Sequence, residues 1–105
     1  MQGYQLTFFT QQNRSHGGKP LVRWLMDMAQ ELAVAGATLS AASEGFGRHH
    51  HLHSAHFIEL ADQPLILTMV VTPEDAGRIF AWLKREQINV FYIKTPVEFG
   101  MSAEG

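Results

Sequence analysis

The chain has 105 residues, a formal net charge of -2, 46% hydrophobic residues and no cysteine. Its length and composition suit one globular domain spanning residues 1–105. The lack of a basic stretch excludes a general nucleic-acid binder, and the lack of cysteine excludes disulfides, thiolate metal sites and cysteine catalysis.

The first predicted elements are a strand and a helix. Residues 3–10, GYQLTFFT, alternate between two faces and are rich in aromatic side chains, which is typical of a strand. Residues 11–18 are polar and glycine-rich, so we expect a loop there. Pro20 suits the first turn of a helix and Gly36 its end. Between them runs an apolar stripe at helical spacing: Leu21, Trp24, Leu25, Met28 and Leu32.

The segment 37–47, ATLSAASEGFG, is expected to be extended, with unusually small side chains. Two interpretations stay open at this point. A ligand or another backbone approaches these small residues closely, or the segment is a thin strand at the edge of a sheet.

The second half of the chain alternates strand and helix again. Residues 53–60 are expected to be extended, and the continuous apolar run 65–71 is typical of a central buried strand. Residues 72–86 begin with a threonine, a proline and two acids, which mark a helix start. Residues 88–94 form the predicted last strand. We therefore expect a folded core at about 2–95 and a loose tail, or an arm that packs on a neighbour, at 96–105.

This order of elements predicts an α+β fold of the ferredoxin-like split βαβ type, with two helices on one face of an antiparallel sheet. The predicted strands 65–71 and 89–93 carry apolar side chains on both faces. Because monomers rarely expose large apolar patches, self-association is the simplest cover for the open face. The N-terminal residues show no secretory signal and the longest apolar run is too short to span a bilayer, so we expect a cytoplasmic protein.

Five of the six histidines lie within residues 49–56. In an extended chain His49, His51 and His53 share one side, where imidazoles could hold zinc, nickel or copper. The same run, together with Arg48, could instead hold a phosphate or carboxylate. The third interpretation is a solvated polar loop, and the residues alone leave all three open.

The GFGR turn at 45–48 precedes the histidines. Gly45 and Gly47 allow a ligand to approach bare backbone N–H groups, and Arg48 adds a fork of donors. No nucleophile, base and orienting group come together in the sequence. We therefore expect a protein that is not an enzyme, with a metal-dependent hydrolase as a distant alternative.

Four stretches together give the chain a family resemblance: GYQLTFF, GKPL, AGATLSAASEGFGRHHHLHSAHF and DQPLILTMVV. They resemble the PII-like family catalogued as domain of unknown function 190, which is similar in fold to the trimeric PII nitrogen-signalling proteins. The resemblance implies a homotrimer with effector nucleotides in the clefts between subunits. It also implies that Gly45, Phe46, Gly47 and Arg48 help to hold an adenine nucleotide, and that the histidines begin a loop equivalent to the PII T-loop.

The chain departs from the PII pattern after the second predicted helix. PII proteins have glycines and a phosphate-binding lysine there, whereas this chain reads KREQINVFYI. This departure speaks against a triphosphate among the candidate effectors AMP, ADP and ATP. The expected effector is a smaller nucleotide such as AMP or ADP, with no nucleotide as the alternative. The expected function is a regulator whose partner is a membrane transporter or channel, or an enzyme. The alternative is a metal-binding module that uses the histidines of residues 49–56.

Overall fold

The computed structural model describes residues 1–41, 44–46, 52–54 and 63–104. The strands in chain order are β1 (Gln2–Gln11), β2 (Ser15–His16), β3 (Lys19–Pro20), β4 (Ala37–Ala41), β5 (Glu44–Phe46), β6 (Leu52–Ser54), β7 (Pro64–Val71) and β8 (Phe91–Glu98). The helices are α1 (Leu21–Glu31) and α2 (Pro73–Arg85). None of the described helices is long and apolar enough to cross a membrane.

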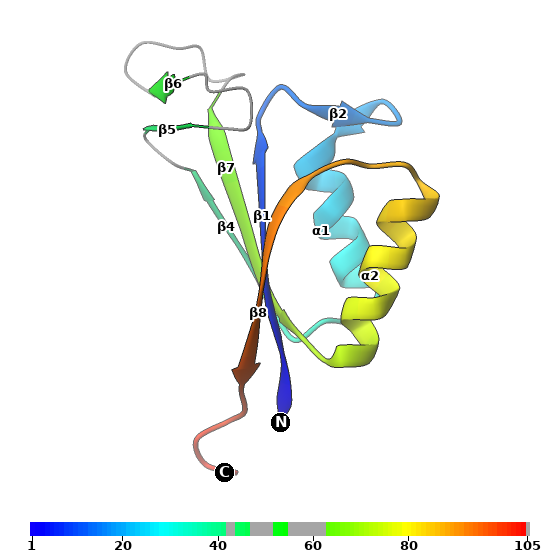
Figure 1. Cartoon of the computed structure of the whole chain (residues 1–105), viewed down its shortest axis with the longest axis vertical. Helices are drawn as coiled ribbons and strands as arrows, with labels where there is room; N and C mark the ends of the chain where they lie inside the picture. The colour runs from blue at the N-terminus through cyan, green and yellow to red at the C-terminus, as the bar shows by residue number, and fades with distance from the viewer. Residues whose placement is uncertain (42–43, 47–51, 55–62, 105) are drawn as a thin grey trace.

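The main sheet has the strand order β4-β7-β1-β8, and all its neighbours are antiparallel. Both helices lie on one face of this sheet, and the β5–β6 hairpin lies at the end where β4 finishes and β7 begins (Figure 1). This is the ferredoxin-like α+β architecture, so the predicted fold class is confirmed. The small-residue segment 37–41 is an edge strand, in line with the second of its two interpretations.

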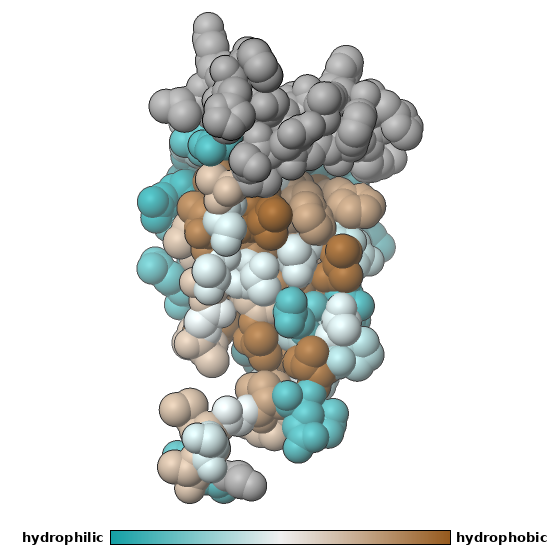
Figure 2. Space-filling view, turned by 90° about the vertical axis from the view of Figure 1, so that its left-hand side faces the viewer, coloured by the Kyte–Doolittle hydropathy of each residue, from teal (hydrophilic) through white to brown (hydrophobic). Residues whose placement is uncertain are grey.

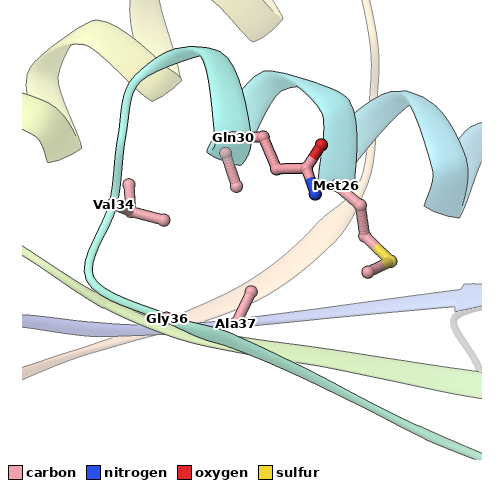
Figure 3. A pocket seen from close by; sticks show the side chains of 6 residues that line it. Met26, Gln30, Val34, Gly36 and Ala37 are labelled. Atoms are coloured by element: carbon pink, nitrogen blue, oxygen red, sulfur yellow. The ribbon is translucent and has the colours of Figure 1, made fainter.

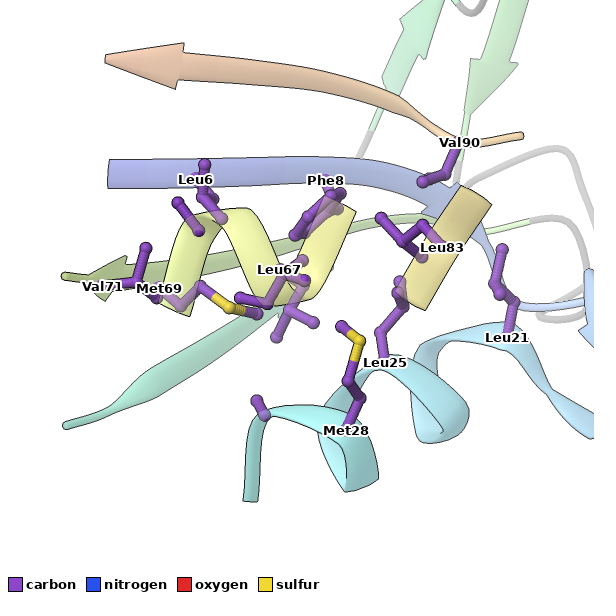
Figure 4. Close-up of a cluster of buried hydrophobic side chains, with 13 residues drawn as sticks. Leu6, Phe8, Leu21, Leu25, Met28, Leu67, Met69, Val71, Leu83 and Val90 are labelled. Carbon is purple, nitrogen blue, oxygen red and sulfur yellow. The ribbon is translucent and has the colours of Figure 1, made fainter. Parts of the chain in front are cut away.

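The core forms between the helices and the inner face of the sheet. Alternate residues of the two central strands point into it, and Leu6, Phe8 and Leu67 are fully buried. Figure 4 shows these side chains meeting the apolar stripe of α1, which includes Leu25 and Met28. Apolar side chains recur at every second residue of the strands and about every 3.6 residues of the helices. The residues that follow these two periods are the ones that form the core.

The ends of the helices follow local chemistry. Thr72 caps α2, because its hydroxyl accepts a 3.1 Å hydrogen bond from the backbone N–H of Asp75. Helix α1 ends at Glu31, short of the expected stop at Gly36. Ala33 and Gln87, just beyond the two helices, have positive φ values of 55° and 57°. Each helix is therefore followed by a residue in the left-handed conformation that is not glycine.

The last strand is longer than the sequence predicted. β8 continues to Glu98, which lies opposite Gln2, so residues 96–98 belong to the sheet and not to a loose tail. Beyond it Phe99 and Met1 exchange two backbone hydrogen bonds of 2.8 Å. The reason for the difference is that β1 starts at Gln2 and offers pairing partners to these residues, whatever their own propensity.

The face of the sheet away from the helices is lined by threonines and apolar side chains. Figure 2 shows brown and pale residues over the middle of this face, with teal residues mostly towards its margins. Phe9, Ile66 and Val70 on this face are half-buried, and Phe91 and Ile93 are exposed. The structure thus has the open, partly apolar face that the sequence predicts.

Candidate functional site

The glycine-containing turn begins in a short hairpin. β5 pairs with β6 so that Gly45 lies opposite His53 and Phe46 lies opposite Leu52. This places the first half of GFGR at the edge of the molecule, directly after the edge strand β4 (Figure 1). Gly47 and Arg48 lie outside the described residues, so their part in the site remains a prediction.

The predicted metal ligands are described only in part. His53 lies on β6, while His49 and His51 fall outside the described residues. Within the described parts of the chain, no three histidine or acidic side chains come together as a metal site. The metal interpretation of the histidine run is therefore left as a prediction.

The β1–α1 connection lies at the same end of the sheet. It contains the small β2–β3 hairpin, where the sequence predicted a plain loop. Gly17 and Gly18 form its turn with φ values of 59° and 82°, a conformation that favours glycine. The backbone N–H of Gln12 donates a 3.0 Å hydrogen bond to the carbonyl of Gln63, which joins this connection to the entry of β7.

Arg14 links this connection to the one between α2 and β8. Its guanidinium donates to the backbone carbonyl of Asn89, and its own carbonyl accepts a 2.8 Å hydrogen bond from the N–H of Leu21. Sequence reasoning missed Arg14, because nothing local connects it with a residue 75 positions away. The structure therefore shows that Arg14 is a further positively charged residue at this end of the sheet.

The sixth histidine, His16, has a structural setting of its own. Its Nε2 lies 3.2 Å from Oε1 of Glu86, and its ring meets the edge of Trp24 at a centroid distance of 5.5 Å. Trp24 in turn meets Trp82 at 5.8 Å. The cluster ties the β2–β3 hairpin to both helices and holds the connections around the candidate site in place.

Thr10 is a second polar residue that the sequence did not single out. It is 7% exposed, and no described residue offers its hydroxyl a hydrogen-bond partner. It is the penultimate residue of β1, so it lies at the same end of the sheet as the β5–β6 hairpin. A buried hydroxyl in this position is a candidate donor to a group outside the described residues.

The surface also has a pocket away from these residues. It lies between α1 and the beginning of β4, and Figure 3 shows Met26, Gln30, Val34 and Ala37 around it. Gln30 supplies the one polar side chain in its lining. Ala37, from the small-residue segment, lines this pocket, but neither the GFGR residues 45–48 nor the predicted metal ligands do.

The fold is shared with solved structures of PII-like proteins. The chain is similar to CPII, a nitrogen regulatory PII-like protein from Thiomonas intermedia K12, with a TM-score of 0.72 and 14% identity. The likeness covers 99% of this chain and 93% of CPII, in a structure bound to ADP, AMP and bicarbonate. It is also similar to a putative PII-like signaling protein from Thermus thermophilus, with a TM-score of 0.67, 19% identity and coverage of 92% and 88%.

The family follows from the sequence match. Residues 3–98 match the DUF190 family, described as an uncharacterized ACR. The chain therefore belongs to the DUF190 family, as the sequence motifs predicted. A relative from Aquifex aeolicus (strain VF5), a UPF0166 protein, is 26% identical over 75 residues, which cover 71% of each chain.

Proposed function

We propose that this protein is a PII-like regulator that binds an adenine nucleotide and is not itself an enzyme. The observation that carries the proposal is the PII-like fold, which the chain shares over nearly its whole length with CPII, a protein solved with ADP and AMP. The expected binding residues are Gly45, Phe46, Gly47 and Arg48. Two of them, Gly45 and Phe46, lie on the described hairpin at the sheet edge.

The chemistry of these residues suits a small anion. Glycines in a turn leave backbone N–H groups open to phosphate oxygens, and the arginine fork pairs with phosphate in a bidentate manner. The α2–β8 connection, residues 86–90, offers neither glycine nor lysine for further phosphates. We therefore expect AMP and ADP to bind more tightly than ATP.

The proposed assembly is a homotrimer with one effector site at each subunit boundary. The open face of the sheet supports self-association, because Phe91 and Ile93 on it are 53% and 48% exposed in the single chain. The effector would change the conformation of residues 47–62, and this change would be sensed by a partner, either a membrane transporter or channel or an enzyme.

Calorimetric titration of the metal-stripped protein with AMP, ADP and ATP tests this proposal. We expect micromolar binding of AMP or ADP, and a loss of affinity of about tenfold or more in Arg48→Ala, because a hydrogen bond to a charged group contributes about 1.5–3 kcal/mol. Arg78→Ala is the matched control. Arg78 is exposed on the first turns of α2, at the other end of the sheet, and pairs with Asp75 at 3.4 Å.

Three results would argue against the proposal. Unchanged affinity in Arg48→Ala would remove Arg48 from the site. Equal losses in Arg48→Ala and Arg78→Ala would indicate a general charge effect. No nucleotide binding, combined with strong zinc uptake that is lost in His51→Ala/His53→Ala, would replace the effector site with a metal site.

A further inference from the structure

Positive charge gathers at the end of the helix layer where α1 begins and α2 ends. Figure 1 shows β2, the first turn of α1 and the last turn of α2 at this end. The contacts Arg14–Asn89 and His16–Glu86 join these elements directly. Five of the chain's eight lysine and arginine residues belong here. We call this surface the basic helix end, and its cations are Arg14, Lys19, Arg23, Lys84 and Arg85.

The acidic residues of the basic helix end do not balance its cations. Oδ2 of Asp27 lies 3.0 Å from Nζ of Lys19, and Oε1 of Glu86 lies 3.2 Å from Nε2 of His16. Five cations and two carboxylates leave a formal charge of +3 with histidine neutral, so the rest of the chain, whose total is -2, carries -5. Among the described residues, Lys19 is the one cation of the five that has an acidic partner. An anionic partner would relieve the repulsion between these like charges.

The helix termini do not offset this positive charge. The first turn of α1 contains no acidic residue and has no side-chain cap, so the partial positive charge of this terminus adds to that of Arg23. The last turn of α2 carries Lys84 and Arg85, whose full charges outweigh the partial negative charge of that terminus. Both helices therefore present positive charge at the same end.

Two tryptophans form an aromatic seam between the helices beside these cations. Trp24 of α1 meets Trp82 of α2 edge-on at a centroid distance of 5.8 Å, and both are half-buried. The guanidinium of Arg85 lies over the ring of Trp82, 5.6 Å from its centroid. This cation–π contact holds Arg85 in place. Arg85 makes no ion pair with any described residue, so its fork of N–H donors is open to a carboxylate.

We infer that the basic helix end docks an acidic segment of a partner protein. Tryptophan and arginine are the residues that most often dominate the binding energy of protein interfaces, and arginine binds carboxylates in a bidentate manner. The contacts between the hairpin and the two helices form the surface in advance, which lowers the entropic cost of binding. It contains none of residues 45–48, so the inference goes beyond the proposed effector site.

A membrane surface fits these observations less well than an acidic segment does. Peripheral membrane proteins insert protruding aromatic side chains into the lipid interface, whereas Trp24 and Trp82 are half-buried against each other. Lipid headgroups would then meet only the charges of this surface. An acidic segment can pair its carboxylates with Arg85 and lay an apolar side chain on the aromatic seam.

Fluorescence quenching tests the charge of the surface, because Trp24 and Trp82 are the two tryptophans of the chain. Iodide is an anionic quencher and caesium a cationic one. Relative to free tryptophan amide, we expect iodide to quench the protein more strongly than caesium at low salt. The difference should vanish at about 1 M salt, where the Debye length is about 3 Å. Stronger quenching by caesium, or equal quenching at low salt, would overturn the inference.

A peptide titration tests the proposed occupant. The probe is a short fluorescein-labelled peptide that repeats glutamate, aspartate and phenylalanine, and the control peptide has glutamine and asparagine in place of the acids. We expect the acidic peptide to bind at low salt, as measured by anisotropy, and to protect the tryptophans from iodide. The control peptide should do neither.

Single substitutions locate the binding surface. Arg85→Gln should weaken peptide binding about tenfold, the order expected for loss of a hydrogen bond between charged groups. Arg23→Gln should weaken it about threefold, as for a surface ion pair. Lys94→Gln is the matched control, because it removes the same charge from β8, where the ammonium lies 4.2 Å from the ring centroid of Tyr4. Its affinity should stay within about twofold of the wild type.

Four outcomes of these titrations would overturn the inference. Equal losses in Arg85→Gln and Lys94→Gln would show an effect of net charge alone. Equal binding of both peptides would show that the carboxylates are not recognised, and no binding of the acidic peptide would remove the proposed occupant. Binding only to vesicles of phosphatidylserine and phosphatidylcholine would assign the surface to a membrane. Because no nucleotide is present, none of these results depends on the effector proposal.

Discussion

Gly3 offers a sharp test of how the two termini are held together. A Cβ atom added at this position would lie 2.2 Å from the carbonyl oxygen of Val71 and 2.7 Å from Cε1 of Phe99. The phenyl ring can move, but the carbonyl belongs to the backbone of β7. Gly3→Ala must therefore displace a strand of the central sheet.

The expected magnitude follows from these two contacts. Overpacking typically costs about 1–3 kcal/mol, and a backbone atom that cannot move aside favours the upper end, about 2–3 kcal/mol. For a domain of this size that corresponds to a fall in Tm of about 10–20 °C. The β1–β8 ladder next to Phe99 should loosen at the same time.

Thermal unfolding monitored by circular dichroism, at matched protein concentrations, is the assay. Gly77→Ala is the control, because Gly77 is exposed within α2 and an added Cβ there would meet nothing within 4 Å. It should stabilise the protein by about 1 kcal/mol, since alanine is the better helix former. Gly3→Ala/Phe99→Ala, compared with Phe99→Ala alone, isolates the contact with Val71. If Gly3→Ala melts within a degree or two of the wild type, the close packing of the termini is refuted.

The helix ends yield two more predictions. Gln87→Gly and Ala33→Gly should each stabilise the protein by about 0.5–1 kcal/mol, because glycine adopts positive φ without the cost that other residues incur. Urea denaturation should show higher midpoints, and lower midpoints would mean that these residues are not left-handed in solution. Thr72→Ala should cost about 1 kcal/mol through loss of the cap to Asp75, while Thr72→Ser should retain most of it. An equal loss in both, measured in the same way, would assign the effect to the methyl group instead.

The fold was largely predictable because its main signals are local. The alternation of β1, the apolar run of β7 and the stripe of α1 each lie within one element and set the core face directly. The cap and the charges of α2 are likewise contained within a few residues. The GFGR motif could be found in the same way, and the family followed from that motif together with three other short stretches.

The candidate site was predictable only in part. The sequence pointed to Gly45 and Phe46, and the structure adds where they lie, beside His53 and Leu52 at the end of an edge strand. No sequence pattern predicted that Arg14 reaches Asn89 or that His16 reaches Glu86. Each of these pairs joins residues at least 70 positions apart, so only the packing of the loops decides them.

The sequence by itself determined where the two helices and the four strands of the main sheet lie and which of their faces are apolar, because neighbouring residues create those periodicities. Only the tertiary structure decided which strands lie at the edges, that β8 extends to Glu98, and that Gly3 must stay small. These features arise from pairing between distant segments. An edge, a ladder end or a close contact is a property of two strands together, and neither strand encodes it alone.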